Sequence, residues 1–136
     1  HLAARTFQTL SGGEQQRVQL ARVLAQLAAG RTVASGQVLL LDEPISSLDL
    51  KHQLALLEAV SSLAEEGIAV LAVLHDLNLA SIFADEIMVM SRGRAVAHGS
   101  PQAVIRDEVI AEVFEVALPV GAIPPEGRPF LLPRRA

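Results

Sequence analysis

Two uninterrupted apolar segments constrain this chain more than any other feature of its sequence. Val38–Leu41 and Ile68–Leu74 contain only aliphatic residues, and each is followed directly by polar ones. Between them, Leu50–Glu66 has apolar residues at helical spacing, namely Leu54, Leu57, Val60 and Leu63. Gly67 is a favourable residue to end this helix. Strand, helix and strand in this order predict a parallel βαβ unit of an α/β protein. We expect its strands to be buried on both faces and its functional groups to lie at their carboxyl ends.

The flanking sequence predicts further elements. An amphipathic helix begins near Gly13 and stops at Gly30, and the loop Arg31–Gln37 leads into the first strand. Beyond the second strand we expect three short helices and a hairpin at the sheet edge, whose strands pack through Met88 and Met90. The ranges are helix 78–84, strands 86–90 and 95–98, a helix starting at Ser100-Pro101, and helix 107–116.

The segment Leu10–Arg17 predicts a helix start that favours phosphate. Ser11 is a credible N-cap, and Glu14 stands three residues later, which is the capping-box spacing. Gly12 and Gly13 allow close backbone approach, and the N–H groups of a helix N-terminus favour an anion.

Asp42 and Glu43 place two consecutive carboxylates after the first apolar strand, and His75 follows the second. Carboxylates at a strand end suit a hydrated Mg²⁺ and a water to be activated. Taken singly, each of these features is more often structural. In this order and spacing they indicate a site for a nucleoside triphosphate.

Composition excludes several other classes. The net charge of −4 and the lack of a basic stripe argue against a nucleic-acid partner, and the absence of cysteine removes disulfides and thiolate metal sites. The apolar runs are far shorter than the roughly 20 residues of a membrane helix. We expect His52 on an exposed helix face and His98 at the end of an edge strand, with neither in a metal or haem site.

These motifs resemble the C-terminal part of an ATP-binding cassette (ABC) transporter ATPase, a P-loop NTPase. Leu10–Gln15 is similar to that family's signature motif, and Val38–Asp42 to its Walker B strand. Ser46–Asp49 is similar to its D-loop. Within the family, the segments 10–27 and 73–81 look most like the ATPases of bacterial haem (hemin) importers, a group close to ferric-siderophore and cobalamin importers.

The resemblance implies a role for each motif. Glu43 and His75 would be catalytic, Asp42 would hold Mg²⁺ through water, and the signature would bind ATP held by the opposing subunit. The residues it implies are Ser11, Gly12, Gly13, Glu14 and Gln15 in the signature, and Ser46, Leu48 and Asp49 in the D-loop at the dimer interface.

The implied protein is a translocase that uses ATP and Mg²⁺ to import hemin. It would act as a homodimer on an inner-membrane permease, peripheral to the cytoplasmic face of that membrane, and indirectly with a periplasmic haem-binding protein. The alternatives are a siderophore or cobalamin importer, a soluble ABC ATPase outside transport, and an inactive truncated product.

Two departures from the family pattern matter. The sequence has no Gly-x-x-x-x-Gly-Lys-[Ser/Thr] loop, so we expect residues 1–116 to form a partial ATPase domain that does not hydrolyse ATP alone, and residues 117–136 a Pro-rich tail. Ile45 stands where the family usually has Thr, and Ser47 where it often has Ala. We expect both changes to alter packing more than chemistry.

Overall fold

The structure is a computed structural model that describes residues 5–30, 36–125 and 127–133 of the 136-residue chain. Most of the predicted loop Arg31–Gln37 lies outside the described residues. The chain divides into two compact units, His1–Leu74 and His75–Ala136, and each is described by itself. Among the described helices, none has both the length and the apolar character that a bilayer span requires.

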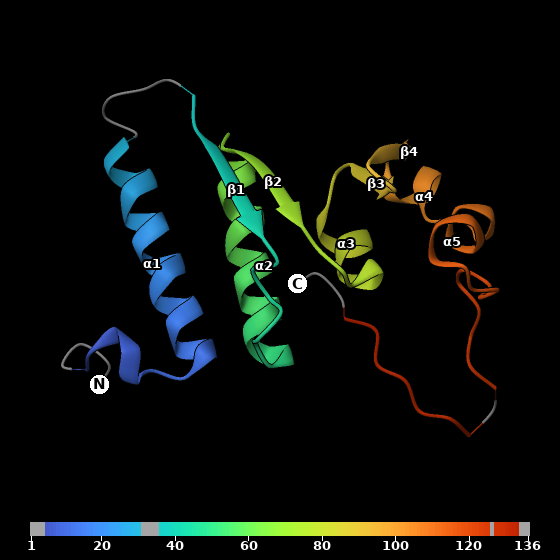
Figure 1. Cartoon of the computed structure of the whole chain (residues 1–136), viewed down its shortest axis with the longest axis horizontal. Helices are drawn as coiled ribbons and strands as arrows, with labels where there is room; N and C mark the ends of the chain where they lie inside the picture. The colour runs from blue at the N-terminus through green and yellow to red at the C-terminus, as the bar shows by residue number, and fades with distance from the viewer. Residues whose placement is uncertain (1–4, 31–35, 126, 134–136) are drawn as a thin grey trace. The chain divides into compact units, whose positions relative to one another are not determined.

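The first unit contains the predicted βαβ motif (Figure 1). A 3₁₀ turn, η1 (Phe7–Thr9), precedes α1 (Gly12–Gly30), which ends at the predicted glycine. The motif follows as β1 (Val38–Asp42), α2 (Leu50–Glu65) and β2 (Ala69–Val73). The two strands pair in parallel with Leu40 opposite Leu71, which confirms the parallel arrangement.

The expectation that both faces of these strands are buried is wrong for the described residues. Leu39 is buried, together with Leu56, Leu57 and Val60 of α2. The opposite face carries Leu40 and Leu71, which are 69% and 65% exposed. Periodicity cannot distinguish the two cases, because an all-apolar strand has the same sequence whether one face or both are covered.

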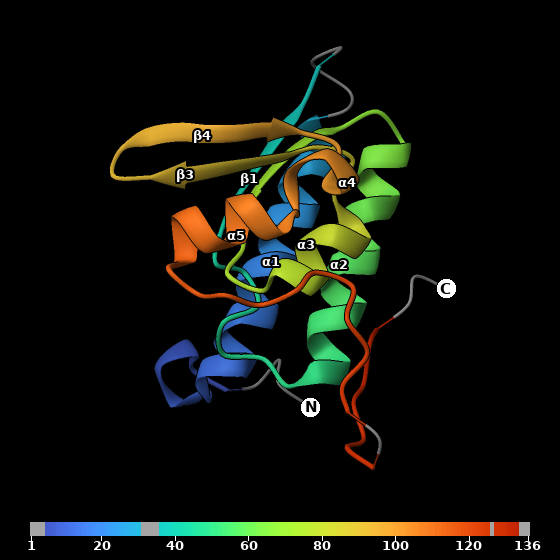
Figure 2. The same ribbon diagram turned by 90° about the vertical axis from the view of Figure 1, so that its right-hand side faces the viewer.

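The second unit contains α3 (Leu77–Phe83), β3 (Ile87–Ser91), β4 (Arg94–Gly99), α4 (Pro101–Val104) and α5 (Asp107–Phe114). Strands β3 and β4 form the predicted antiparallel hairpin. The expectation that it lies at the edge of the main sheet is wrong, because in the described residues β3 and β4 pair only with each other, as a two-stranded sheet of their own. Figure 2 shows the hairpin with α4 and α5 on one side. Ile87 and Val89 pack there with Val104 and Val109 to form the core of this unit.

The prediction that Met88 and Met90 contribute to strand packing is wrong. Their side chains are 56% and 62% exposed, whereas Ile87 and Val89 are buried. Successive residues of a strand point to opposite faces, so the buried pair and the methionines necessarily separate. The sequence pattern identifies these two sets but does not say which of two apolar faces the helices cover.

Candidate functional site

The N-terminus of α1 forms the predicted capping box. The Ser11 backbone N–H and hydroxyl both donate to Glu14 Oε2, at 2.8 and 2.9 Å, and the Glu14 N–H lies 3.4 Å from Ser11 Oγ. The Ser11 carbonyl accepts the first helical hydrogen bond, from Gln15 N. The carboxylate of Glu14 therefore occupies the donors of Ser11 that a phosphate would need.

These contacts lower the pKa of the Glu14 carboxyl. The hydrogen bond from the Ser11 backbone N–H is the largest cause, followed by the Ser11 hydroxyl, with the positive charges of Arg5 and Arg17 acting in the same direction. The structure thus favours the ionised form of Glu14, which suits an acidic residue in the first turn of a helix.

We expect Glu14→Gln to remove a pH-dependent part of the stability. A lowered pKa means that the stabilisation is complete above the ordinary glutamate value of about 4.3 and is lost as the pH falls through the lower folded value. The variant should be less stable than the parent at about pH 7, and the difference should shrink towards about pH 3. Urea unfolding at both pH values checks this, with the exposed Glu58→Gln as control. An equal difference at both pH values would contradict it.

Gln15 joins the capping box to the turn that precedes it. Its Nε2 donates to the carbonyl oxygens of Leu10 and Phe7, at 3.0 and 3.3 Å. Leu10 is buried, so the segment before Ser11 is fixed by both packing and hydrogen bonds.

The two glycines of this segment lie beside the turn that follows β1. A Cβ added to Gly13 would sit 3.4 Å from the Ser47 carbonyl oxygen and 3.6 Å from Leu48 Cδ2. A Cβ on Gly12 would meet only Ser47 Oγ, at 4.0 Å. These are ordinary van der Waals distances, so the described fold has room for a methyl group at both positions. The packing of the described fold therefore does not itself require glycine at Gly12 or Gly13.

The two predicted carboxylates lie at the carboxyl end of β1, and both are exposed. Glu43 has a left-handed backbone with φ of 44°. A non-glycine residue in this region carries a strain of about 1–2 kcal/mol, and such residues cluster at functional sites. Hydrogen bonds hold it there: Glu43 N donates to the Val73 carbonyl at 3.2 Å, and Ser46 N and Oγ donate to the Glu43 carbonyl at 3.3 and 3.1 Å.

The turn continues into a capped helix start at α2. Asp49 Oδ1 accepts from the His52 N–H at 3.0 Å and contacts His52 Nδ1 at 2.7 Å. Hydrogen bonds from the His52 N–H and ring are the largest causes of a lowered pKa at Asp49, and Arg17 contributes a smaller charge effect. Ile45 and Leu48 are buried, so Ile45 belongs to the packing of the turn.

Gln53 makes the same kind of contact at the start of α2 that Gln15 makes at the start of α1. Its Nε2 donates to the carbonyls of Leu48 and Ile45, at 3.0 and 3.2 Å. Sequence reasoning missed this residue. The available signal was a glutamine four residues after a helix N-cap, present at both helices.

Two predicted residues remain, His75 and Asp42. His75 is the first residue of the second unit, and the next residue, Asp76, caps α3 by accepting from Asn78 N and Leu79 N at 2.8 and 3.0 Å. Within the described ranges, no three acidic, histidine or cysteine side chains gather as a metal cage. Mg²⁺ does not need one, since it keeps several waters and uses one or two carboxylates with substrate phosphates. The exposed Asp42 fits that mode of binding.

Two histidines each contact a carboxylate, which the sequence did not predict. His52 was expected on an exposed face, and its ring contacts Asp49 with 37% of the side chain exposed. His98 lies in β4 and contacts Glu86 at 3.1 Å.

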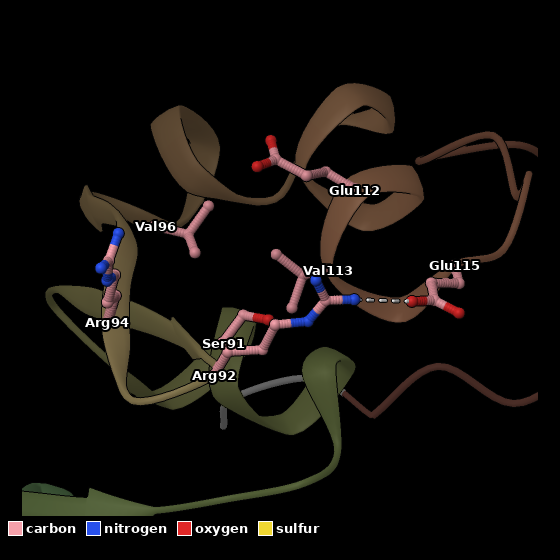
Figure 3. Close-up of a pocket in the computed structure, with 7 residues that line it drawn as sticks. All are labelled: Ser91, Arg92, Arg94, Val96, Glu112, Val113 and Glu115. Atoms are coloured by element: carbon pink, nitrogen blue, oxygen red, sulfur yellow. Dashed lines mark hydrogen bonds and ion pairs between the residues drawn. The ribbon is translucent and has the colours of Figure 1, made fainter.

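An open pocket of about 440 Å³ lies in the second unit, between the β3–β4 hairpin and α5 (Figure 3). None of the predicted site residues lines it. Its charged lining is balanced between Arg92 and Arg94 on one side and Glu112 and Glu115 on the other, and an exposed ion pair of 3.5 Å joins Arg92 to Glu115. This pocket therefore does not belong to the candidate site, whose residues lie at the start of α1, at the end of β1 and in the segments that follow β1 and β2.

The chain is similar over nearly its whole length to hemin import ATP-binding proteins. It is 54% identical to that of Rhodopseudomonas palustris over 100% of the chain and 50% of the relative, and 53% identical to that of Mesorhizobium japonicum over 97% and 50%. The protein of Myxococcus xanthus is 52% identical over 98% and 49%. The chain thus spans about half the length of the curated relatives it matches. No family model matches the sequence.

Solved structures with the same fold are ABC transporter components. A metal-chelate type ABC transporter in an inward-facing conformation matches 86% of this chain and 43% of its own, with a TM-score of 0.69 and 27% identity. The ATP-binding cassette of another ABC transporter matches 85% and 43%, with a TM-score of 0.65 and 24% identity. The fold is that of the C-terminal part of an ABC ATPase domain.

Proposed function

We propose that this chain, whose sequence and fold are those of the C-terminal part of an ABC transporter ATPase, works within a subunit that hydrolyses ATP to drive hemin import. The observation that carries the ATPase proposal is Glu43, an exposed carboxylate at the end of β1 in a left-handed backbone conformation. The similarity to hemin import ATP-binding proteins supports the substrate.

In this proposal the carboxylates at the end of β1 share the chemistry. Asp42 holds Mg²⁺ through water, and the ion neutralises charge on the phosphates of ATP. Glu43 orients the attacking water and accepts its proton, and His75 donates a hydrogen bond to the transferred phosphate. Phosphoryl transfer depends on positioning and charge stabilisation, which these side chains supply.

The signature segment, Leu10–Gln15, has a separate role in the proposal. The Ser11 donors and the N–H groups of Gly12 and Gly13 bind phosphate oxygens of ATP held by the opposing subunit of a homodimer, and Glu14 and Gln15 belong to the same surface. Because Ser11 donates to Glu14 in this structure, the phosphate has to displace that carboxylate. Ser46 and Asp49, which are exposed, face the partner subunit in this arrangement, whereas the side chain of Leu48 is buried in the turn and would support this surface from beneath. Closure of the dimer on ATP then drives the permease.

The proposed subunit is peripheral to the cytoplasmic face of the inner membrane and acts with an inner-membrane permease and a periplasmic haem-binding protein. Residues 117–136 form a tail to the ATPase domain in this view. The described part of this tail contains no helix or strand.

The experiment is transport by the full-length subunit, reconstituted with its permease in vesicles. We expect ATP hydrolysis and uptake to rise when hemin-loaded binding protein is supplied. A metal-chelate type transporter among the similar structures makes ferric siderophore the second candidate, with cobalamin beside it. Stimulation by one of these and not by hemin would overturn the hemin assignment and keep the ATPase. Hydrolysis unaffected by any loaded binding protein would contradict a role in import.

A further inference from the structure

We propose that Gln15 and Gln53 are positioning residues, each of which fixes the loop before its helix through a two-pronged hydrogen bond from the side-chain amide. Gln15 would hold the signature segment, and Gln53 would hold the turn from Glu43 to Leu48. The inference rests on the proposed function, because it assigns these two loops to the nucleotide.

The two contacts have the same geometry. Each glutamine stands four residues after the N-cap of its helix, Ser11 or Asp49. Each Nε2 donates to the carbonyl five residues earlier at 3.0 Å and to the carbonyl eight residues earlier, at 3.3 Å for Gln15 and 3.2 Å for Gln53. We call this arrangement the amide clamp.

An amide is suited to this contact for a simple reason. The glutamine NH₂ group has two hydrogens, and each can serve one carbonyl. A glutamate would place a carboxylate against two carbonyl oxygens, which repel it. A methionine of similar length would leave both carbonyls without this donor.

The clamp on α2 bears on Glu43 through a short chain of contacts. Gln53 fixes Ile45 and Leu48, and the Leu48 N–H donates to the Ile45 carbonyl at 3.2 Å. Ser46, which lies between them, donates twice to the Glu43 carbonyl. The strained backbone of Glu43 is thus held on one side by Val73 and on the other by the clamped turn. Loss of the clamp weakens one of the two supports of this backbone, so we expect Glu43 to shift from its left-handed conformation.

The two clamps therefore predict different kinetic defects. Loss of the Gln53 clamp displaces the group that acts on the attacking water, so kcat falls while ATP affinity is kept. Loss of the Gln15 clamp disturbs a surface that binds ATP in the ground state, so the KM for ATP rises more than kcat falls.

The test compares Gln53→Glu, Gln53→Met, Gln15→Glu and Gln15→Met in the full-length subunit assembled with its permease. Gln19→Glu is the matched control, since Gln19 lies exposed on α1 and makes no side-chain hydrogen bond within the described residues. Steady-state ATP hydrolysis gives kcat and KM, nucleotide titration gives the ATP affinity, and thermal melting reports the fold.

We expect the Gln53 variants to lose kcat on the order of tenfold to a hundredfold with ATP affinity unchanged, because a displacement of about 1 Å has effects of this size. The Gln15 variants should raise the KM for ATP about tenfold. This factor corresponds to the free energy of one hydrogen bond at the upper end of its usual range. If Gln53→Glu does not fold, Gln53→Met carries the test. Equal effects on kcat and KM at both sites, in proportion to lost melting temperature, would reduce the clamps to structural contacts and overturn the proposal. Unaltered kinetics would overturn it too.

The failure of this inference is distinguishable from the failure of the proposed function. If the parent complex hydrolyses ATP and the clamp variants match it, only the positioning role falls. If the parent complex itself does not hydrolyse ATP, the proposed function and the inference that rests on it are both overturned.

Discussion

Glu43→Gln is expected to abolish ATP turnover by the full-length subunit and to leave ATP binding intact. Glutamine has the size of glutamate but cannot accept the proton of the attacking water. Proton transfer by a positioned side chain contributes typically about 10²–10⁴-fold, so we expect a fall in kcat of that order. The side chain is exposed and glutamine has the same length, so we expect little effect on packing.

Single-turnover hydrolysis and nucleotide titration on the same preparation measure the two effects separately. Glu58→Gln is the matched control, because Glu58 is also exposed and lies on α2. Glu43→Gln should melt at the temperature of the parent, since both side chains carry the same backbone strain at φ of 44°. Turnover at the parent rate would remove Glu43 from the chemistry and leave its strained backbone without a functional explanation.

Gly12→Ala and Gly13→Ala are expected to preserve or raise stability while they lower ATP hydrolysis at least about tenfold. Alanine in a helix interior is favoured over glycine by about 0.5–1 kcal/mol, so at these first two residues of α1 we expect at most that gain, and the fold has room for the added methyl at both. The loss of activity would come from the approach of a phosphate to the backbone, which a methyl group obstructs.

Gly36→Ala is the control for this pair. Gly36 has no heavy atom within 4 Å of an added Cβ. Chemical unfolding and ATP hydrolysis should therefore be unchanged in this variant, whereas the other two should separate stability from activity. A loss of stability in Gly12→Ala that accounts for its lost activity would contradict the role of this segment as a phosphate surface.

Sequence reasoning recovers the βαβ motif because its signals are local and periodic. Aliphatic runs mark β1 and β2, helical spacing marks α2, and glycines mark the ends of α1 and α2. Element boundaries agree to within one or two residues: α3 was predicted at 78–84 and spans Leu77–Phe83. The capping box at Ser11 was predictable for the same reason, since both partners lie within four residues.

The sequence could not show which apolar faces are covered. Leu40 is as aliphatic as Leu39, and Met90 is apolar like Val89, yet Leu40 and Met90 are exposed whereas Leu39 and Val89 are buried. Whether a strand face is buried depends on which helix or strand packs against it. The sequence of an all-apolar strand does not contain this information.

The side-chain contacts and backbone angles of the candidate site also could not be predicted from the sequence. The contact between His52 and Asp49 and the positive φ of Glu43 depend on rotamers and on backbone angles of a turn. The residue types at these positions allow other conformations as well. The assigned roles of His75 and Asp42 still come from their motifs and remain predictions.

The amide clamps also have a consequence for the order in which the chain folds. Their bonds close segments of five and eight residues, and closing such short segments takes little chain entropy and about 10–100 ns. Pairing of β1 with β2 must instead bring together strands separated by the whole of α2. We therefore expect the segment from Ile45 to Leu48 to acquire its shape while α2 nucleates, before the sheet assembles. The hydrogen bond from Glu43 N to the Val73 carbonyl forms only when β2 joins β1, so the strained backbone of Glu43 would be completed last, on a turn that is already in place.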